Sequence, residues 1–209
     1  MNREEKNRLT RRRIMDSALA EFASQGYGAS SVNTIAASEQ LSKGIIYHYF
    51  ENKDELYLAC VEECFQSLTE YLRRKMERTE GGIRQQLEAY FSYRVEFFRA
   101  NPVYQPIFCE AVVSPPGHLE GRIRQKRRAF DAFTAETLEQ LLQPLSLRDG
   151  LTVQQVVELF RHFQDFINAQ DRETAGDPQQ RYELRDEYCR RMLDVLLYGV
   201  LERGIEQNV

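Results

Sequence analysis

Apolar residues recur at helical spacing along almost the whole chain, and no stretch alternates long enough with a period of two to form a convincing strand. In the first such segment, Ile14, Ala18 and Phe22 recur every four residues, which predicts an amphipathic helix over about residues 10–25. Gly26 follows at the position where a helix C-cap favours glycine. The pattern as a whole predicts an all-α fold.

Two short helices are expected next. Either Ser30 or Ser31 can cap a helix that ends near Glu39, and Ser42 can cap the helix after it. Two short helices separated by three or four residues, behind a longer amphipathic helix, are typical of a three-helix DNA-binding unit that contains a helix-turn-helix.

A long helix is predicted from Asn52 to about residue 78. Asn52 is the expected cap, and Glu55 stands three residues later, as a capping box requires. Proline- and glycine-containing breaks then divide the rest of the chain. The helices expected there span about residues 83–99, 102–113, 118–142, 152–170 and 179–203.

Charge is distributed unevenly over the 209 residues. The net charge is −4, but the first fifteen residues carry six basic side chains against two acidic ones. A basic end on an acidic chain favours a phosphate-rich partner at that end. No run of about 18 apolar residues and no secretory signal is present, so we expect a cytoplasmic protein without a membrane partner.

Little in the sequence indicates an enzyme or a metal site. There is no nucleophile turn with a Ser-His-Asp order, no HExxH and no glycine-rich phosphate loop. The four cysteines, at positions 60, 64, 109 and 189, are interpreted as buried reduced thiols, with a metal or redox site as the alternative. We expect no catalytic residues, no metal and no cofactor. A helical enzyme without a recognisable motif and a protein-interaction module remain the alternative functions.

The segment from Ile35 to Lys53 resembles the signature of the TetR (tetracycline repressor) family of bacterial transcriptional regulators. The residues that carry the resemblance are Ile35-Ala36, Ser42-Lys43-Gly44, Tyr47, Tyr49-Phe50 and Lys53, preceded by Phe22 and Gly26-Tyr27. The resemblance implies a homodimeric, ligand-responsive repressor that a small molecule releases from a palindromic operator. It implies a DNA-binding domain over residues 1–52 and a helical ligand-binding and dimerisation domain over residues 53–209.

The resemblance also implies which residues meet double-stranded operator DNA. Helix N-termini favour phosphate, glycine permits close approach, and Lys, Tyr and His can reach phosphates or base edges. The candidates are Ser31, Asn33, Lys43, Gly44, Tyr47, His48, Tyr49 and Lys53. The turn departs from the family pattern at Glu39, which puts a negative charge near the DNA, and at Gln40. A left-handed Gln40 costs on the order of 1 kcal/mol relative to glycine.

Aromatic side chains are concentrated in the later helices, where ordinary core packing explains most of them. A pocket for an apolar or aromatic effector needs only a few, together with some polar groups. The candidate ligand-binding residues are Phe65, Tyr93, Phe97, Tyr104, Phe108, Phe133, His162 and Phe163. The last two predicted helices are apolar over a wide arc, which favours a four-helix homodimer interface and leaves internal packing as the alternative.

Overall fold

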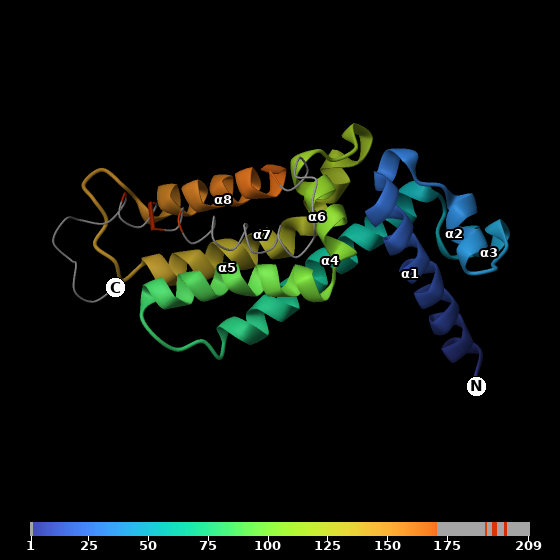
Figure 1. The fold of residues 1–209 in the computed structure, drawn as a ribbon, viewed down its shortest axis with the longest axis horizontal. Coiled ribbons are helices and arrows are strands. Elements are labelled where there is room, and N and C mark those ends of the chain that lie inside the picture. Colours follow the sequence, from blue (N-terminus) through green and yellow to red (C-terminus); the bar gives the residue numbers. More distant parts are fainter. Residues whose placement is uncertain (1, 171–190, 192–193, 196–198, 200–209) are drawn as a thin grey trace. The chain divides into compact units, whose positions relative to one another are not determined.

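A computed structural model describes residues 2–170, 191, 194–195 and 199 (Figure 1). All of its regular elements are helices, which confirms the all-α prediction for the described part of the chain. They are α1 (Arg3–Ala29), α2 (Val32–Ser38), α3 (Lys43–Tyr49), α4 (Lys53–Met76), α5 (Ile83–Ala100), α6 (Tyr104–Val113), the short 3-10 helix η1 (Gly117–Leu119), α7 (Glu120–Leu142) and α8 (Val153–Gln170).

The helices form two compact units. The first unit consists of Met1–Gln66 and Asn101–Arg128, so it contains α1 to α3, the start of α4, α6, η1 and the start of α7. Its core includes Ile14, Phe22 and Ile46, all at most 1% exposed. The ring of Tyr57 meets that of Phe22 edge-on, with the centroids 5.0 Å apart. Helices α1 to α3, which we call the head, therefore pack around the first turns of α4.

The second unit consists of Ser67–Ala100 and Ala129–Val209 and has an aromatic interior. The ring of Phe91 on α5 lies 6.2 Å from the rings of both Phe160 and Phe163 on α8. The guanidinium of Arg94 is also buried and lies over the ring of Phe130, 5.6 Å from its centroid. Since α4 and α7 each contribute residues to both units, two helices run continuously from one unit into the other.

The compact units do not coincide with a division after residue 52. The first fourteen residues of α4 belong to the first unit, and so do α6 and the start of α7. The predicted domains 1–52 and 53–209 are a functional division, which stays a prediction.

The first helix begins seven residues earlier than its apolar stripe predicts. The side chain of Asn2 caps it, with Oδ1 accepting from the Glu5 amide at 2.7 Å. Glu4 and Glu5 lie in the first turn, where carboxylates suit the positive end of the helix dipole. The prediction of a start near residue 10 was wrong, because it relied on apolar spacing and overlooked this cap.

The apolar arc of α8 is partly used within the second unit. Val156, Phe160 and Phe163 are buried there, whereas Leu159 is 43% exposed. The last predicted helix, 179–203, lies outside the described residues apart from four positions. The homodimer interface therefore stays a prediction. Within the described residues, no helix is long and apolar enough to cross a membrane.

Candidate nucleic-acid interface

The turn between α2 and α3 has the geometry of a helix C-cap that usually contains glycine. The amide of Leu41 donates to the Ala36 carbonyl at 2.9 Å, and the amide of Gln40 donates to the Ala37 carbonyl at 3.1 Å. This pair of bonds is a Schellman motif, which places the residue after the cap in the left-handed region. Gln40 occupies that position with φ 54°. The conformation considered for Gln40 from the sequence is confirmed.

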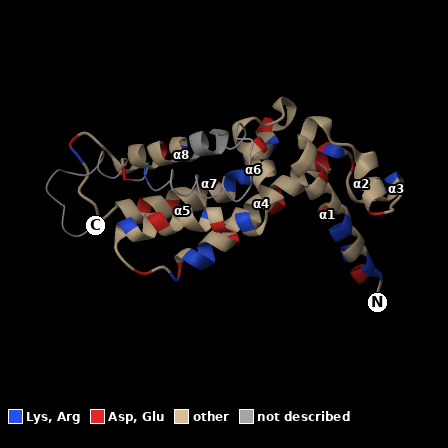
Figure 2. Ribbon diagram, viewed as in Figure 1, with Lys and Arg blue, Asp and Glu red and all other residues tan. Residues whose placement is uncertain are grey.

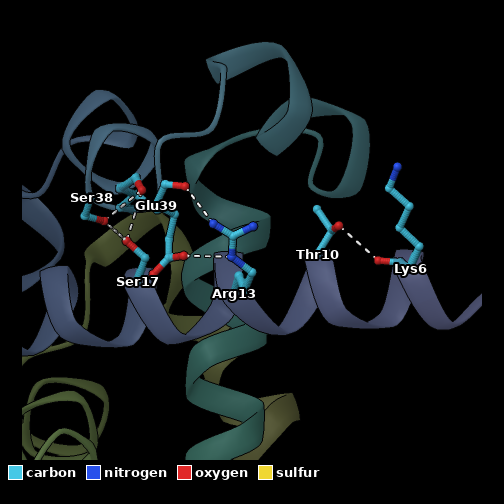
Figure 3. Close-up of polar contacts among 7 residues, drawn as sticks. Lys6, Thr10, Arg13, Ser17, Ser38 and Glu39 are labelled. Carbon is cyan, nitrogen blue, oxygen red and sulfur yellow. Dashed lines mark hydrogen bonds and ion pairs between the residues drawn. The ribbon is translucent and has the colours of Figure 1, made fainter. Parts of the chain in front are cut away.

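The charge of Glu39 is matched inside the protein (Figure 3). Arg13 on α1 donates from Nε to Oε2 of Glu39 at 2.9 Å and from Nη2 to its backbone carbonyl at 2.8 Å. One turn further along α1, the hydroxyl of Ser17 contacts that of Ser38 and donates to the Ile35 carbonyl at 3.0 Å. Glu39 thus fixes the turn against α1, and its negative charge is offset by Arg13.

The third helix is capped and anchored as the sequence predicts. The Ile45 amide donates to Oγ of Ser42 at 3.3 Å, which confirms Ser42 as the cap. Ile46 and Phe50 are buried and hold α3 to the rest of the head. The opposite face consists of exposed residues: Lys43, Gly44, Ile45, Tyr47 and His48.

Two of these exposed side chains lie together. Nζ of Lys43 lies 5.6 Å from the centroid of the Tyr47 ring, and Tyr47 is 42% exposed. Gly44 lies between them in sequence, and a Cβ there would meet nothing closer than the Ser42 hydroxyl at 3.8 Å. The described part of the protein therefore imposes no requirement for glycine at position 44. A close external partner would impose one.

Tyr49 lies differently from the other candidates. It is half-buried, and its hydroxyl donates to Oδ1 of Asn7 on α1 at 3.1 Å. The ring of His48 meets the Tyr49 ring edge-on, with the centroids 5.2 Å apart. Tyr49 thus links α3 to the start of α1, while its predicted contact with DNA stays a prediction.

The start of α2 presents the two remaining candidates of the helix-turn-helix. Ser31 is confirmed as the cap, since its Oγ accepts from the Asn33 amide at 3.2 Å. Its own amide donates to Oε1 of Glu21 at 2.9 Å. The Asn33 side chain is exposed.

Lys53 is engaged within the protein. Its ammonium donates to the Ser30 carbonyl at 2.8 Å and lies over the Tyr27 ring, 4.5 Å from the centroid. An ammonium carries three N–H donors, so it can still bind a phosphate. The start of α4 is capped by Asn52, whose Oδ1 accepts from the Glu55 amide at 2.9 Å, as predicted.

A network around Tyr27 was not foreseen from the sequence. The backbone turns at Gly26, with φ 71°, and the next amide, that of Tyr27, donates to both carboxylate oxygens of Glu110 on α6 at 3.1 Å. The same carboxylate accepts from the buried hydroxyl of Tyr57 on α4 at 2.9 Å. A Cβ at position 26 would stand 3.2 Å from Oε1 of Glu110. Glu110 therefore joins α6 to α4 and to the end of α1 after its kink at Gly26, a segment called the α1–α2 connection below.

The hydroxyl of Tyr27 completes the network. It donates to Asp54 and lies 3.1 Å from Nε2 of His118 on η1, which also lies 3.3 Å from Oδ2 of Asp54. Burial and the Asp54 hydrogen bond raise the pKa of Tyr27 to about 12. The hydrogen bond from Tyr27 lowers the pKa of Asp54, and His118 lowers it further. The backbone amide of Tyr27 thus contacts α6, its ring contacts α4, and its hydroxyl contacts both α4 and η1.

The eight candidate ligand residues do not gather in one unit. Phe65, Tyr104 and Phe108 belong to the first unit, where the rings of Phe65 and Phe108 pack 5.3 Å apart. The other five belong to the second unit: Tyr93, Phe97, Phe133, His162 and Phe163. Of these, His162 is exposed. The composition of the pocket stays a prediction.

The cysteines within the described residues are free and buried: Cys60, Cys64 and Cys109. Burial raises the pKa of the Cys60 and Cys64 thiols, which keeps them protonated and unreactive at neutral pH. The interpretation as buried reduced thiols is confirmed for these three. Cys189 lies outside the described residues.

Residues 14–60 match the family model described as bacterial regulatory proteins, tetR family. The matched stretch contains α2, α3 and the Schellman turn, together with the cap and first turns of α4. This match places the N-terminal part of the chain with the tetR family of bacterial regulatory proteins. The resemblance inferred from residues 35–53 is thereby confirmed.

Individual relatives agree with this family. Over 62 residues, the chain is 32% identical to the IcaR regulator of Staphylococcus epidermidis, a negative transcriptional regulator of the biofilm operon icaADBC; the match covers 30% of this chain and 34% of IcaR. Over 100 residues it is 28% identical to the transposon Tn10 TetC protein of Escherichia coli, covering 48% of this chain and 50% of TetC. The chain thus spans about a third to a half of these two relatives.

The whole fold also has a solved counterpart. The transcriptional regulator FadR from Bacillus subtilis, in complex with stearoyl-CoA, superposes with a TM-score of 0.67 at 18% identity, covering 90% of this chain and 97% of FadR. At this identity the likeness shows the fold. The likeness in fold covers far more of the chain than the 47 residues that the family model matches.

Proposed function

We propose that this tetR-family chain is a homodimeric transcriptional repressor that binds a palindromic operator through α3 and is released by a small molecule. The observation that carries the proposal is the two-sided construction of α3. Ile46 and Phe50 are buried, while Lys43 and Tyr47 stand together on the exposed face. A face that combines a cation, an aromatic hydroxyl and an unobstructed glycine suits a DNA groove.

Replacing both Lys43 and Tyr47 with alanine tests this assignment. Each contact with a base or phosphate contributes about 1–3 kcal/mol, so losing two contacts should cost at least about 2 kcal/mol for each protomer, which is about 30-fold in affinity. Because both side chains are exposed, the melting temperature and the dimer mass should stay unchanged. The matched control is Arg128→Ala, which removes an exposed cation from α7. Operator binding that survives in the double variant would refute the assignment of α3 as the reading helix.

The effector is proposed to be apolar or aromatic and to bind in the second unit. The aromatic interior around Phe91, Phe160 and Phe163 supports this, as does the structural likeness to a regulator that holds stearoyl-CoA. Thermal-shift measurements with fatty acyl-CoA esters and aromatic acids, followed by operator release, test the proposal. The proposal predicts that a compound raising the melting temperature also weakens operator binding.

The response is proposed to pass along α4 to the DNA-binding head. The first residues of α4 contact the α1–α2 connection through Lys53, Asp54 and Tyr57. The same helix continues into the second unit from Ser67. An effector that binds one arrangement of α4 more tightly would favour that arrangement. If the operator requires the other arrangement, fewer molecules would then have a head that fits the DNA.

A further inference from the structure

The first turns of α1 are not explained by the packing of the head. Residues 2–9 are all exposed, and the first buried residue of α1 is Ile14. Figure 1 shows this end of the helix running on past α2 and α3. A short exposed helix is only marginally stable by itself, so its order calls for specific contacts. We call residues 3–11 the α1 extension.

Two contacts fix the α1 extension beside the end of α3. Asn7 accepts the hydrogen bond from the hydroxyl of Tyr49, and the guanidinium of Arg11 lies over the ring of Phe50, 5.2 Å from its centroid. Asn7 and Arg11 are four residues apart and therefore share a face of the helix. Arg3 is one further turn along that face, and Lys6 lies at its border, about 100° from Asn7 on the side away from Arg8 and Arg12. This face is therefore cationic and lies next to the reading helix.

The other basic residues of α1 point elsewhere. Arg12 donates to Asp16 at 2.8 Å and to Glu63 on α4 at 2.8 Å, and Arg13 is held by Glu39. The side chains of Arg12 and Arg13 are therefore engaged within the protein. The side chains of Arg3 and Lys6 make no hydrogen bond or ion pair with any residue that the structure describes, although the Lys6 carbonyl accepts from the Thr10 hydroxyl at 3.0 Å. Figure 2 shows basic residues, coloured blue on the ribbon, along this half of α1.

We propose that Arg3 and Lys6 on the α1 extension bind DNA phosphates beside the half-site that α3 reads. This inference rests on the proposed function and adds a second contact to it. A duplex fits this surface better than a protein partner, because the extension has a single large apolar side chain, Leu9, and no apolar stripe. Glu4 lies on the Arg11 side of this face, but both Glu4 and Glu5 are at least about 100° around the helix from Arg3 and from Lys6.

The salt dependence of binding tests the proposal. The probe is a labelled duplex selected from a randomised library by the wild-type dimer. Each lost phosphate contact reduces the magnitude of the negative slope of log K against log salt by about 0.9. When two protomers bind, one substitution removes two contacts and reduces the magnitude by about 1.8. Arg3→Gln and Lys6→Gln are each expected to show this loss, with base preference unchanged.

Arg8→Gln is the matched control, since Arg8 carries the same charge on the same exposed helix. It lies four residues before Arg12, on the face directed toward α4 rather than α3. Its slope should stay close to that of the wild type. Equal losses in all three variants would indicate a general charge effect and overturn the proposal, and so would slopes that do not change. A wild-type chain that selects no duplex would overturn the proposed function as well.

Discussion

Glu110 is predicted to be a major stabilising residue of the first unit, although it is only half-buried. Its carboxylate accepts from the Tyr57 hydroxyl at 2.9 Å and from the Tyr27 amide at 3.1 Å. Tyr57 is 0% exposed, so after Glu110→Ala its hydroxyl would have lost a partner in a site closed to water. A buried donor left without a partner costs about 1–3 kcal/mol, and a hydrogen bond to a charged group contributes about 1.5–3 kcal/mol.

Together, these losses give an expected destabilisation of about 2–4 kcal/mol for Glu110→Ala. For a chain of this length, each kcal/mol lowers the melting temperature by about 2–4 °C, so a fall of roughly 5–15 °C is expected. The assay is thermal unfolding by circular dichroism, at one protein concentration and without effector, because both dimerisation and ligands shift the midpoint. Glu110→Gln keeps one acceptor oxygen and should lose less.

A double-mutant cycle separates the hydrogen bond from general packing. Tyr57→Phe removes the donor but keeps the ring, which packs against Phe22. In that background, Glu110→Ala should cost about 1–2 kcal/mol less than in the wild type, because the buried hydroxyl is no longer stranded. Additive effects, or a Glu110→Ala variant that melts within 1 °C of the wild type, would refute this reasoning.

Three further predictions concern the same head. Gly26→Ala should destabilise by about 1–3 kcal/mol in urea unfolding, because φ 71° is unfavourable for alanine and its Cβ would crowd Glu110. Gln40→Gly should raise stability by up to about 1 kcal/mol in the same assay, while Gln40→Ala stays within a few tenths. The lowered pKa of Asp54 predicts stability that is present above about pH 4 and lost as the pH falls through the folded pKa; Asp54→Asn should flatten that part of the pH profile.

The caps of α2, α3 and α4 could be predicted because a cap is a local feature. Ser31, Ser42 and Asn52 each bond an amide two or three residues ahead, so the sequence contains both partners side by side. Asn2 with Glu5 three residues later is the same signal at the start of α1. The residues after it have no apolar spacing, so apolar spacing alone does not predict this helix start.

The network around Tyr27 could not be predicted in this way. Glu110 is 83 residues from Tyr27 in sequence, and no local pattern brings α6 to the α1–α2 connection. The role of Gly26 shows the same limit. Its position after the apolar stripe predicts a C-cap, but only the folded chain shows a carboxylate 3.2 Å from where its Cβ would stand. The residues that line a pocket are also distant in sequence. Candidates chosen by aromatic residue type alone therefore include three that lie in the first unit.

Lys53 and Tyr27 change how the proposed response of the head is understood. If Lys53 bound only phosphate, the start of α4 would be coupled to α2 and α3 through Lys53 only when DNA is bound. Lys53 also donates to the Ser30 carbonyl and lies on the Tyr27 ring, so we expect a shift of the first turn of α4 to displace the start of α2 even without DNA. Since Glu110 holds the amide of Tyr27 from α6, α4 and α6 act on one residue. Tyr27 is therefore where we expect the two helices to set the arrangement of α2 and α3.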